Sequence, residues 1–134
     1  VSEDPEKLAE VWPEFFDKIL VDAPCSGEGM FRRMMTGKRL DQQSPEYYSP
    51  IQRRILEQAV AMLKPGGMLL YSTCTFSRLE DEDNVNFLLE SHPEMELVPF
   101  NLASVPGSAD GIGLNGCMRL FPHRMKGKAI FWRF

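Results

Sequence analysis

Two cysteines stand a few residues after short apolar runs, and they are the residues best suited to chemistry. Cys25 follows the run 19–21 and Cys74 follows the run 68–71. A continuous apolar run bounded by turn residues is typical of a strand buried on both faces. Ligands of open α/β sheets bind at the carboxyl ends of the strands. If the two strands are neighbours in a parallel sheet, we expect both thiols in one cleft, with the carboxylate of Asp22 beside them.

Such a pair suits the formation and release of a covalent adduct. The thiolate is the form that attacks carbon, and a thiol near a helix N-terminus tends to have a lowered pKa. Cys74 precedes an expected helix that Ser77 would cap, so we predict Cys74 to be the nucleophile. A cysteine in a turn after a strand is more often a small packing residue, and this alternative stays open for Cys25 and Cys74. We interpret Cys117 as an ordinary reduced thiol. No Cys-x-x-Cys is present, so disulfide exchange fits poorly.

Composition limits the class of protein. The chain has 134 residues and a net charge of −4, which predicts one soluble domain that does not hold nucleic acid by bulk charge alone. No apolar run approaches the roughly 18 residues of a membrane span, and the first residues do not form a signal peptide. Three cysteines without metal-ligand spacing predict reduced thiols, no zinc site and a cytoplasmic location.

The order of expected elements predicts an α/β fold. A helix opens with Asp4 as N-cap and Pro5 at the first position, and a strand follows at 18–22. A second helix begins with Ser49 as cap, and a strand follows the turn 64–67. A capping box at 77–80 begins a third helix, whose first turn is acidic. Strands are expected at 96–100 and 129–134, separated by a loop over 101–116. Strands alternating with helices favour a doubly wound, mostly parallel sheet.

Two segments leave alternatives open. The basic connection 26–44, which includes Arg32 and Arg33, is either a solvated loop or a loop that contacts phosphates. The strand 18–22 has no earlier strand to pair with, which would leave an exposed sheet edge. Either the chain associates with itself through that edge, or it is the back half of a larger domain. We favour the second interpretation.

Five motifs resemble one known family, the Sun-domain RNA (cytosine-5) methyltransferases, and most closely the bacterial 16S ribosomal RNA branch. The motifs are Asp22-Ala23-Pro24-Cys25-Ser26-Gly27, Gln52-Arg53, Leu63-Lys64-Pro65-Gly66-Gly67, Ser72-Thr73-Cys74-Thr75 and Arg119-Leu120-Phe121-Pro122-His123-Arg124. The resemblance implies a Rossmann-like class I methyltransferase fold and the cofactor S-adenosyl-L-methionine. It also implies ribosomal RNA as partner, with a target base flipped out of its stack.

The resemblance also implies residue roles. Cys74 would add to carbon 6 of cytosine, which makes carbon 5 able to take a methyl group, and Cys25 would assist release of the product. Asp22 matches the carboxylate where cofactor and base meet. The residues expected to contact the substrate are Pro24, Arg32, Arg33, His123 and Arg124.

The chain departs from the family pattern at several points. Residues 1–134 resemble the C-terminal half of the catalytic domain, without the first three strands and the glycine-rich cofactor loop. The usual Glu-Asn-Glu appears as Glu80-Asp81-Glu82. We therefore expect this chain alone to bind S-adenosyl-L-methionine weakly, and to need the missing half or a second copy as partner.

Two other functions compete with this one. The chain could be a non-catalytic RNA-binding or scaffolding remnant of the same fold. It could also be a cysteine hydrolase with Cys74 as nucleophile and His123 as base, although no oxyanion arrangement is visible. A lone histidine such as His123 is more often structural than catalytic.

Overall fold

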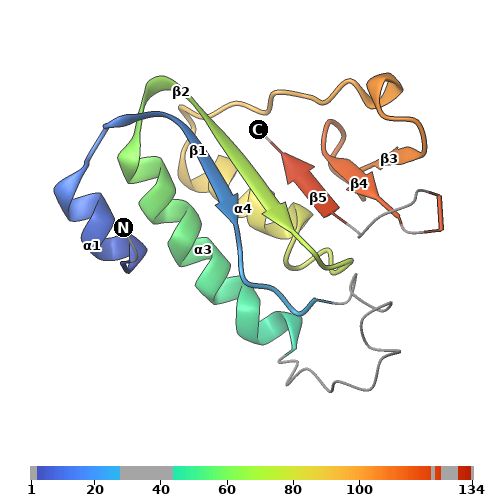
Figure 1. The fold of residues 1–134 in the computed structure, drawn as a ribbon, viewed down its shortest axis with the longest axis horizontal. Helices are drawn as coiled ribbons and strands as arrows, with labels where there is room; N and C mark the ends of the chain where they lie inside the picture. The colour runs from blue at the N-terminus through green and yellow to red at the C-terminus, as the bar shows by residue number, and fades with distance from the viewer. Residues whose placement is uncertain (1–2, 28–43, 122, 125–129, 134) are drawn as a thin grey trace.

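A computed structural model describes residues 3–27, 44–121 and 123–124, together with the backbone of 130–133 (Figure 1). Its helices are α1 (Pro5–Val11), α3 (Pro45–Met62), α4 (Glu82–Ser91) and the 3-10 helix η2 (Leu102–Ser104). Its strands are β1 (Phe16–Asp22), β2 (Leu63–Thr73), β3 (Ser108–Asp110), β4 (Met118–Leu120) and β5 (Ile130–Arg133). No helix in the described part of the chain is long and apolar enough to cross a bilayer.

The strands form one mixed sheet in the order β1-β2-β5-β4-β3. Strands β1 and β2 are parallel neighbours, with Leu20 opposite Leu70 and Asp22 opposite Ser72. Strands β5, β4 and β3 join by antiparallel pairing. The expected α/β fold is confirmed, but among the described strands only β1 and β2 pair in parallel, so the sheet is mixed rather than mostly parallel. The two strands that precede the cysteines end at the same edge of the sheet.

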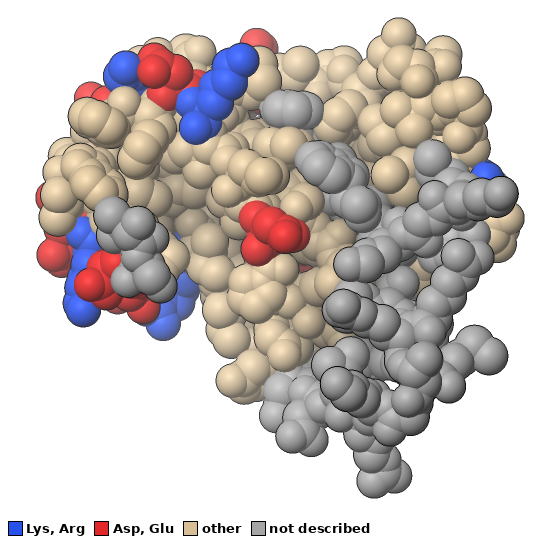
Figure 2. All heavy atoms as spheres, in the orientation of Figure 1, with Lys and Arg blue, Asp and Glu red and all other residues tan. Residues whose placement is uncertain are grey.

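Helices α3 and α4 cover one face of β1 and β2 (Figure 1). Val21, Leu69 and Tyr71 project into this core, where they meet Leu56 and Leu88. The alternate side chains of β1 point the other way, and Leu20 is 60% exposed. The expectation that this strand is buried on both faces is therefore wrong for the described residues. Figure 2 shows that face mostly tan, with an acidic group near its centre and a basic side chain toward its upper edge.

The second helix begins earlier than its sequence signals suggested. The sequence offers two Ser-Pro pairs, and α3 uses the first, with Ser44 as N-cap and Pro45 at the first position. Pro50 lies inside the helix, still near its start. The prediction that Ser49 caps this helix is wrong, because Ser49 and Gln52 both face the interior.

Further boundaries also differ from expectation. Helix α4 begins at Glu82 rather than after Ser77, because the peptide N–H groups of Glu80 and Asp81 close a turn onto the carbonyl of Ser77. Residues 96–100 form no strand. The three-residue strands β3 and β4 were not foreseen, because they are too short to show a periodic pattern. The predicted closing strand is confirmed as β5.

Candidate active site at the ends of two parallel strands

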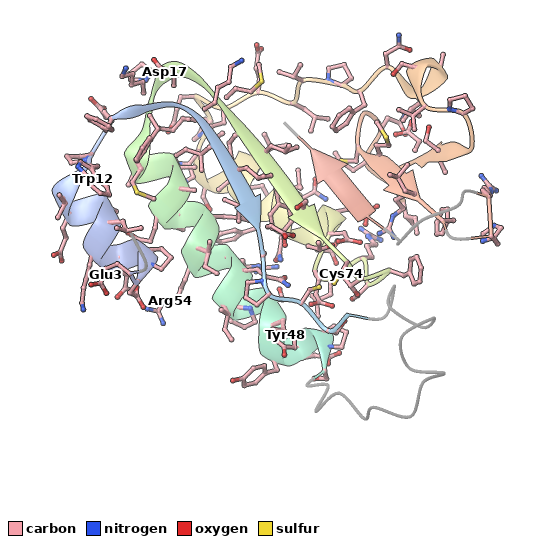
Figure 3. All side chains as sticks on the ribbon, viewed as in Figure 1. Glu3, Trp12, Asp17, Tyr48, Arg54 and Cys74 are labelled. Carbon is pink, nitrogen blue, oxygen red and sulfur yellow. The ribbon has the colours of Figure 1, made fainter. Side chains whose placement is uncertain are left out.

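The two predicted cysteines meet where β1 and β2 end. Their sulfur atoms lie 3.1 Å apart, and the backbone N–H of Cys74 donates to Cys25 Sγ at 3.3 Å. Both thiols are free and half-buried. Figure 3 labels Cys74 at the end of β2, beside the chain that leaves β1. The two thiols therefore lie together at one edge of the sheet, as the sequence predicts.

The segments that carry the cysteines run side by side beyond the sheet. Ser72 Oγ donates to the Asp22 carboxylate at 3.1 Å, and the Ala23 N–H donates to the Ser72 carbonyl at 3.0 Å. One step past the cysteines, the hydroxyl oxygens of Ser26 and Thr75 are 2.9 Å apart. These cross-links continue the β1–β2 pairing past the last ladder residue, which fixes the two thiols relative to each other.

The sulfur–sulfur hydrogen bond makes the two thiols unequal. The Cys25 thiol lowers the pKa of Cys74 to about 7 by donating to its sulfur, although burial and the carboxylate of Asp22 oppose this. The same hydrogen bond, together with burial, raises the pKa of Cys25. The sequence predicted a lowered pKa for Cys74 from a helix N-terminus. The larger cause is the second thiol, because α4 begins only at Glu82.

A buried carboxylate holds the turn that carries Cys25. Glu80 is fully buried, and its Oε1 accepts from the Ser26 N–H at 2.9 Å and from Gln52 Nε2 at 3.0 Å. Its Oε2 accepts from Ser26 Oγ at 2.5 Å. The amide of Gln52 also donates to the Pro24 carbonyl at 2.8 Å. The chain is thus held on both sides of Cys25.

Helix α4 completes this network through Asn84. Its amide donates to Gln52 Oε1 at 2.7 Å, and its own oxygen accepts from Ser49 Oγ and Arg53 Nε, both at 2.9 Å. The hydroxyl of Tyr71 donates to the Glu80 carbonyl at 2.6 Å. Buried polar groups are stable only when they are hydrogen-bonded, and these are.

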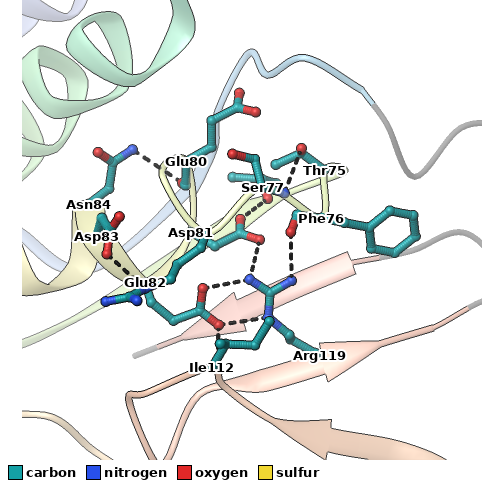
Figure 4. Close-up of polar contacts among 12 residues, drawn as sticks. Thr75, Phe76, Ser77, Glu80, Asp81, Glu82, Asp83, Asn84, Ile112 and Arg119 are labelled. Carbon is teal, nitrogen blue, oxygen red and sulfur yellow. Dashed lines mark hydrogen bonds and ion pairs between the residues drawn. The ribbon is translucent and has the colours of Figure 1, made fainter. Parts of the chain in front are cut away.

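A buried ion pair supports the turn between β2 and α4 (Figure 4). Arg119 donates to both oxygens of Glu82, at 2.6 and 2.5 Å, and to the Phe76 carbonyl at 3.1 Å. Its guanidinium also lies 3.1 Å from the Asp81 carboxylate, which is fully buried. Burial raises the pKa of Asp81, and hydrogen bonding and the nearby Arg119 charge oppose this shift.

Sequence reasoning missed this polar interior. The sequence pattern places Gln52 near a helix start, and it places Asp81 and Glu82 in an acidic first turn that would complement a helix dipole. All are fully buried, as are Glu80 and Asn84. The one signal available was a run of four acidic residues, 80–83, with Arg78 as the one basic residue at helical spacing, which is unusual for a stable surface helix.

The remaining predicted site residues divide into two groups. Asp22 and Pro24 are exposed beside the thiols, and the Asp22 carboxylate could accept hydrogen bonds from a cofactor there. His123 and Arg124 are exposed, and both contact Phe121, with centroid distances of 5.6 and 5.8 Å. The Phe121 ring stacks on the ring of Phe76, with 5.7 Å between centroids, and Phe76 lies two residues after Cys74.

The other predicted RNA contacts, Arg32 and Arg33, lie outside the described residues. Within the described ranges, no three cysteine, histidine, aspartate or glutamate side chains gather as a metal site. In the described part of the chain, the sulfur of Cys74 makes its side-chain hydrogen bond with Cys25 and not with His123. This arrangement does not support the hydrolase alternative.

Comparisons with known proteins address the family directly. A family model described as "16S rRNA methyltransferase RsmB/F" matches residues 1–133. Ribosomal RNA small subunit methyltransferase F of Klebsiella pneumoniae is 43% identical over 115 residues, which cover 82% of this chain and 23% of that protein. The mouse tRNA (cytosine(72)-C(5))-methyltransferase NSUN6 is 45% identical over 87 residues, 65% of this chain and 18% of that protein.

A solved structure agrees in fold. NSun6 from Pyrococcus horikoshii, solved with SFG, superposes with a TM-score of 0.80 at 32% identity, covering 99% of this chain and 33% of that one. SFG is an analogue of S-adenosyl-L-methionine, and with the family match it supports that cofactor. The chain spans about a quarter of the length of the curated relatives it matches. On the match of the family model to nearly its whole length, the chain belongs to the 16S rRNA methyltransferase RsmB/F family.

Proposed function

We propose that this chain carries the catalytic thiols of an RNA (cytosine-5) methyltransferase that acts on ribosomal RNA. The thiolate of Cys74 adds to carbon 6 of a flipped cytosine, and the electron pair of the 5,6 double bond moves to carbon 5. S-adenosyl-L-methionine, when bound, supplies the methyl group that carbon 5 takes. The carbon 5 proton then passes to water and its bonding pair re-forms the 5,6 double bond. The bond between carbon 6 and sulfur breaks at the same time, and its electron pair leaves on Cys74 as thiolate.

Cys25 is proposed to assist the release step. Its sulfur is 3.1 Å from Cys74 Sγ, so it can stabilise the departing thiolate by donating a hydrogen bond. This distance between two thiols of separate segments is the observation that carries the proposal. A non-catalytic remnant would have no need to keep both thiols free and half-buried at one site.

We assign supporting roles to the neighbouring residues. Asp22 would hydrogen-bond cofactor or base at the carboxyl end of β1, and Pro24 would line the base pocket beside it. The positive charge of Arg124 suits the phosphates of an RNA backbone, and the rings of His123 and Phe121 suit an unstacked base. Arg32 and Arg33 are proposed to bind phosphates. The cytoplasmic location predicted from composition remains part of this proposal.

Cysteine replacement tests the mechanism. In the protein that contains this chain, Cys25→Ala should make a covalent adduct with RNA accumulate, because formation proceeds while release is slowed. Cys74→Ala should abolish the adduct, and Cys117→Ala serves as the matched control because Cys117 is fully buried in the core. Denaturing gel electrophoresis of labelled RNA measures the adduct. Equal adduct levels in all three variants would rule out the proposed mechanism.

We further propose that the free edge and uncovered face of β1 contact a further segment that holds the cofactor. Parallel strands are ordinarily covered on both faces, yet Leu20 is 60% exposed on an edge strand. Calorimetry with S-adenosyl-L-methionine should accordingly show weak binding to the 134-residue chain and tighter binding to a protein that also supplies the glycine-rich loop. Equal affinities would contradict this arrangement.

A further inference from the structure

We propose that Glu80 and Gln52 are positioning residues that hold the Cys25 turn against Cys74. The inference rests on the proposed function, in which the two thiols act as a pair. Neither side chain touches a sulfur through any described contact. Their hydrogen bonds go instead to the residues on either side of Cys25, namely Pro24 and Ser26.

The hydrogen-bond directions around Glu80 are fixed by its carboxylate. The Ser26 hydroxyl donates its one hydrogen to Glu80 Oε2. The Thr75 hydroxyl must then donate to Ser26 Oγ, and Thr75 itself accepts from the Ser77 N–H at 3.1 Å. One buried carboxylate thereby orders a chain of donors that joins the Cys25 turn to the Cys74 turn.

Gln52 holds the Cys25 turn on the side of Pro24, and all of its side-chain polar groups are hydrogen-bonded. Both hydrogens of its amide are used, one on the Pro24 carbonyl and one on Glu80, while its oxygen accepts from Asn84. An unmet buried donor or acceptor is costly, so the amide cannot rotate without breaking this set. Helix α3 and the turn before α4 therefore fix where Cys25 can lie.

The consequence is measurable as thiol reactivity. The largest cause that lowers the pKa of Cys74 is its hydrogen bond with Cys25, whereas the carboxylates of Asp22 and Glu80 and burial all act to raise it. If the Cys25 turn moves away, the pKa of Cys74 should rise from about 7 toward the ordinary 9.0. At pH 7 the thiolate fraction would fall about fiftyfold, and the higher intrinsic nucleophilicity would return a factor of roughly 6 to 10. Alkylation should thus slow by about five- to eightfold.

The experiment measures iodoacetamide labelling of each cysteine in the complete chain by mass spectrometry across pH. We expect Ser26→Ala and Gln52→Leu to raise the midpoint for Cys74 and to slow its labelling at pH 7. Ser49→Ala is the matched control, because Ser49 is as buried as Ser26, at 4% exposure, and joins the same network only through Asn84. It should leave the midpoint unchanged. Fully buried Cys117 reports unfolding, since it labels only when the core opens.

Glu80→Ala separates positioning from simple charge. Loss of a nearby negative charge alone would lower the midpoint for Cys74, whereas release of the turn raises it. Glu80→Gln should largely restore the wild-type profile, since its amide can donate to Ser26 Oγ if the hydroxyl chain reverses. If Glu80→Ala unfolds the chain, Ser26→Ala and Gln52→Leu decide the question. A wild-type profile in both, or a lowered midpoint in folded Glu80→Ala, would overturn the inference. Labelling needs neither RNA nor cofactor, so this result is independent of the adduct experiment.

Discussion

Replacing Arg119 with methionine should remove a large share of the stability of the fold. Arg119 is 2% exposed, and it is the cation that faces two fully buried carboxylates, Glu82 and Asp81. Breaking a buried pair by removing one partner costs about 3 to 5 kcal/mol, because the remaining charge stays buried without compensation. A chain of this length has a total stability of roughly 7 to 20 kcal/mol. The loss would therefore be a substantial fraction of the free energy of unfolding.

Urea denaturation followed by circular dichroism measures this loss. With a slope of about 2 kcal/mol per molar urea, Arg119→Met should lower the midpoint by about 2 M. Lys64→Met is the matched control, because Lys64 makes an exposed ion pair with Asp17, at 2.9 Å, and its loss should move the midpoint far less. Equal midpoint shifts in the two variants would refute the reasoning.

The pH dependence of the Arg119→Met penalty gives a second check. Burial raises the pKa of Asp81 in the folded state above its unfolded value. This carboxyl therefore weakens the fold once the pH exceeds its unfolded pKa, and protonation relieves that cost as the pH falls. Since a neutral Asp81 no longer needs a cation, the difference between Arg119→Met and wild type should be smaller at pH 5 than at pH 8.

Two further outcomes follow from the described contacts. Mild oxidation with diamide should join Cys25 to Cys74, whose sulfurs are 3.1 Å apart, before it modifies buried Cys117; peptide mapping that finds mixed pairs with Cys117 instead would contradict the site geometry. For His92, partial burial opposes protonation, but the carboxylates of Glu57 and Glu94 outweigh it and raise its pKa above 6.5. The stability that protonated His92 adds through these carboxylates is present below pH 6.5 and is lost as the pH rises through the folded pKa. After allowance for solvent screening, His92→Gln should cost about 0.5 kcal/mol at pH 5.5 and nothing at pH 9. Thermal denaturation at both pH values tests this, and a larger penalty at pH 9 would reverse the assignment.

Local pattern was sufficient for much of the fold. The apolar runs before Cys25 and Cys74 predicted two strands, and their turn residues placed both thiols at the strand ends. The Asp4-Pro5 pair predicted the start of α1, where the Asp4 carboxylate accepts from the Glu6 N–H at 3.0 Å. These features depend on neighbours within a few residues, so the sequence alone contains the information. Near neighbours do not decide between the Ser-Pro pairs at 44–45 and 49–50, since both pairs are good helix starts.

The polar interior was decided only by tertiary structure. Gln52 and Glu80 are 28 residues apart, Ser26 and Glu80 are 54 apart, and Glu82 and Arg119 are 37 apart. Hydrophobic periodicity cannot distinguish a carboxylate in water from one that is buried, because burial is tolerated only when distant donors reach it. By itself, the sequence determined which residues could do chemistry and on which elements they lie. The packing of α3, α4 and β4 around the strand ends determined which polar side chains hold those residues in place.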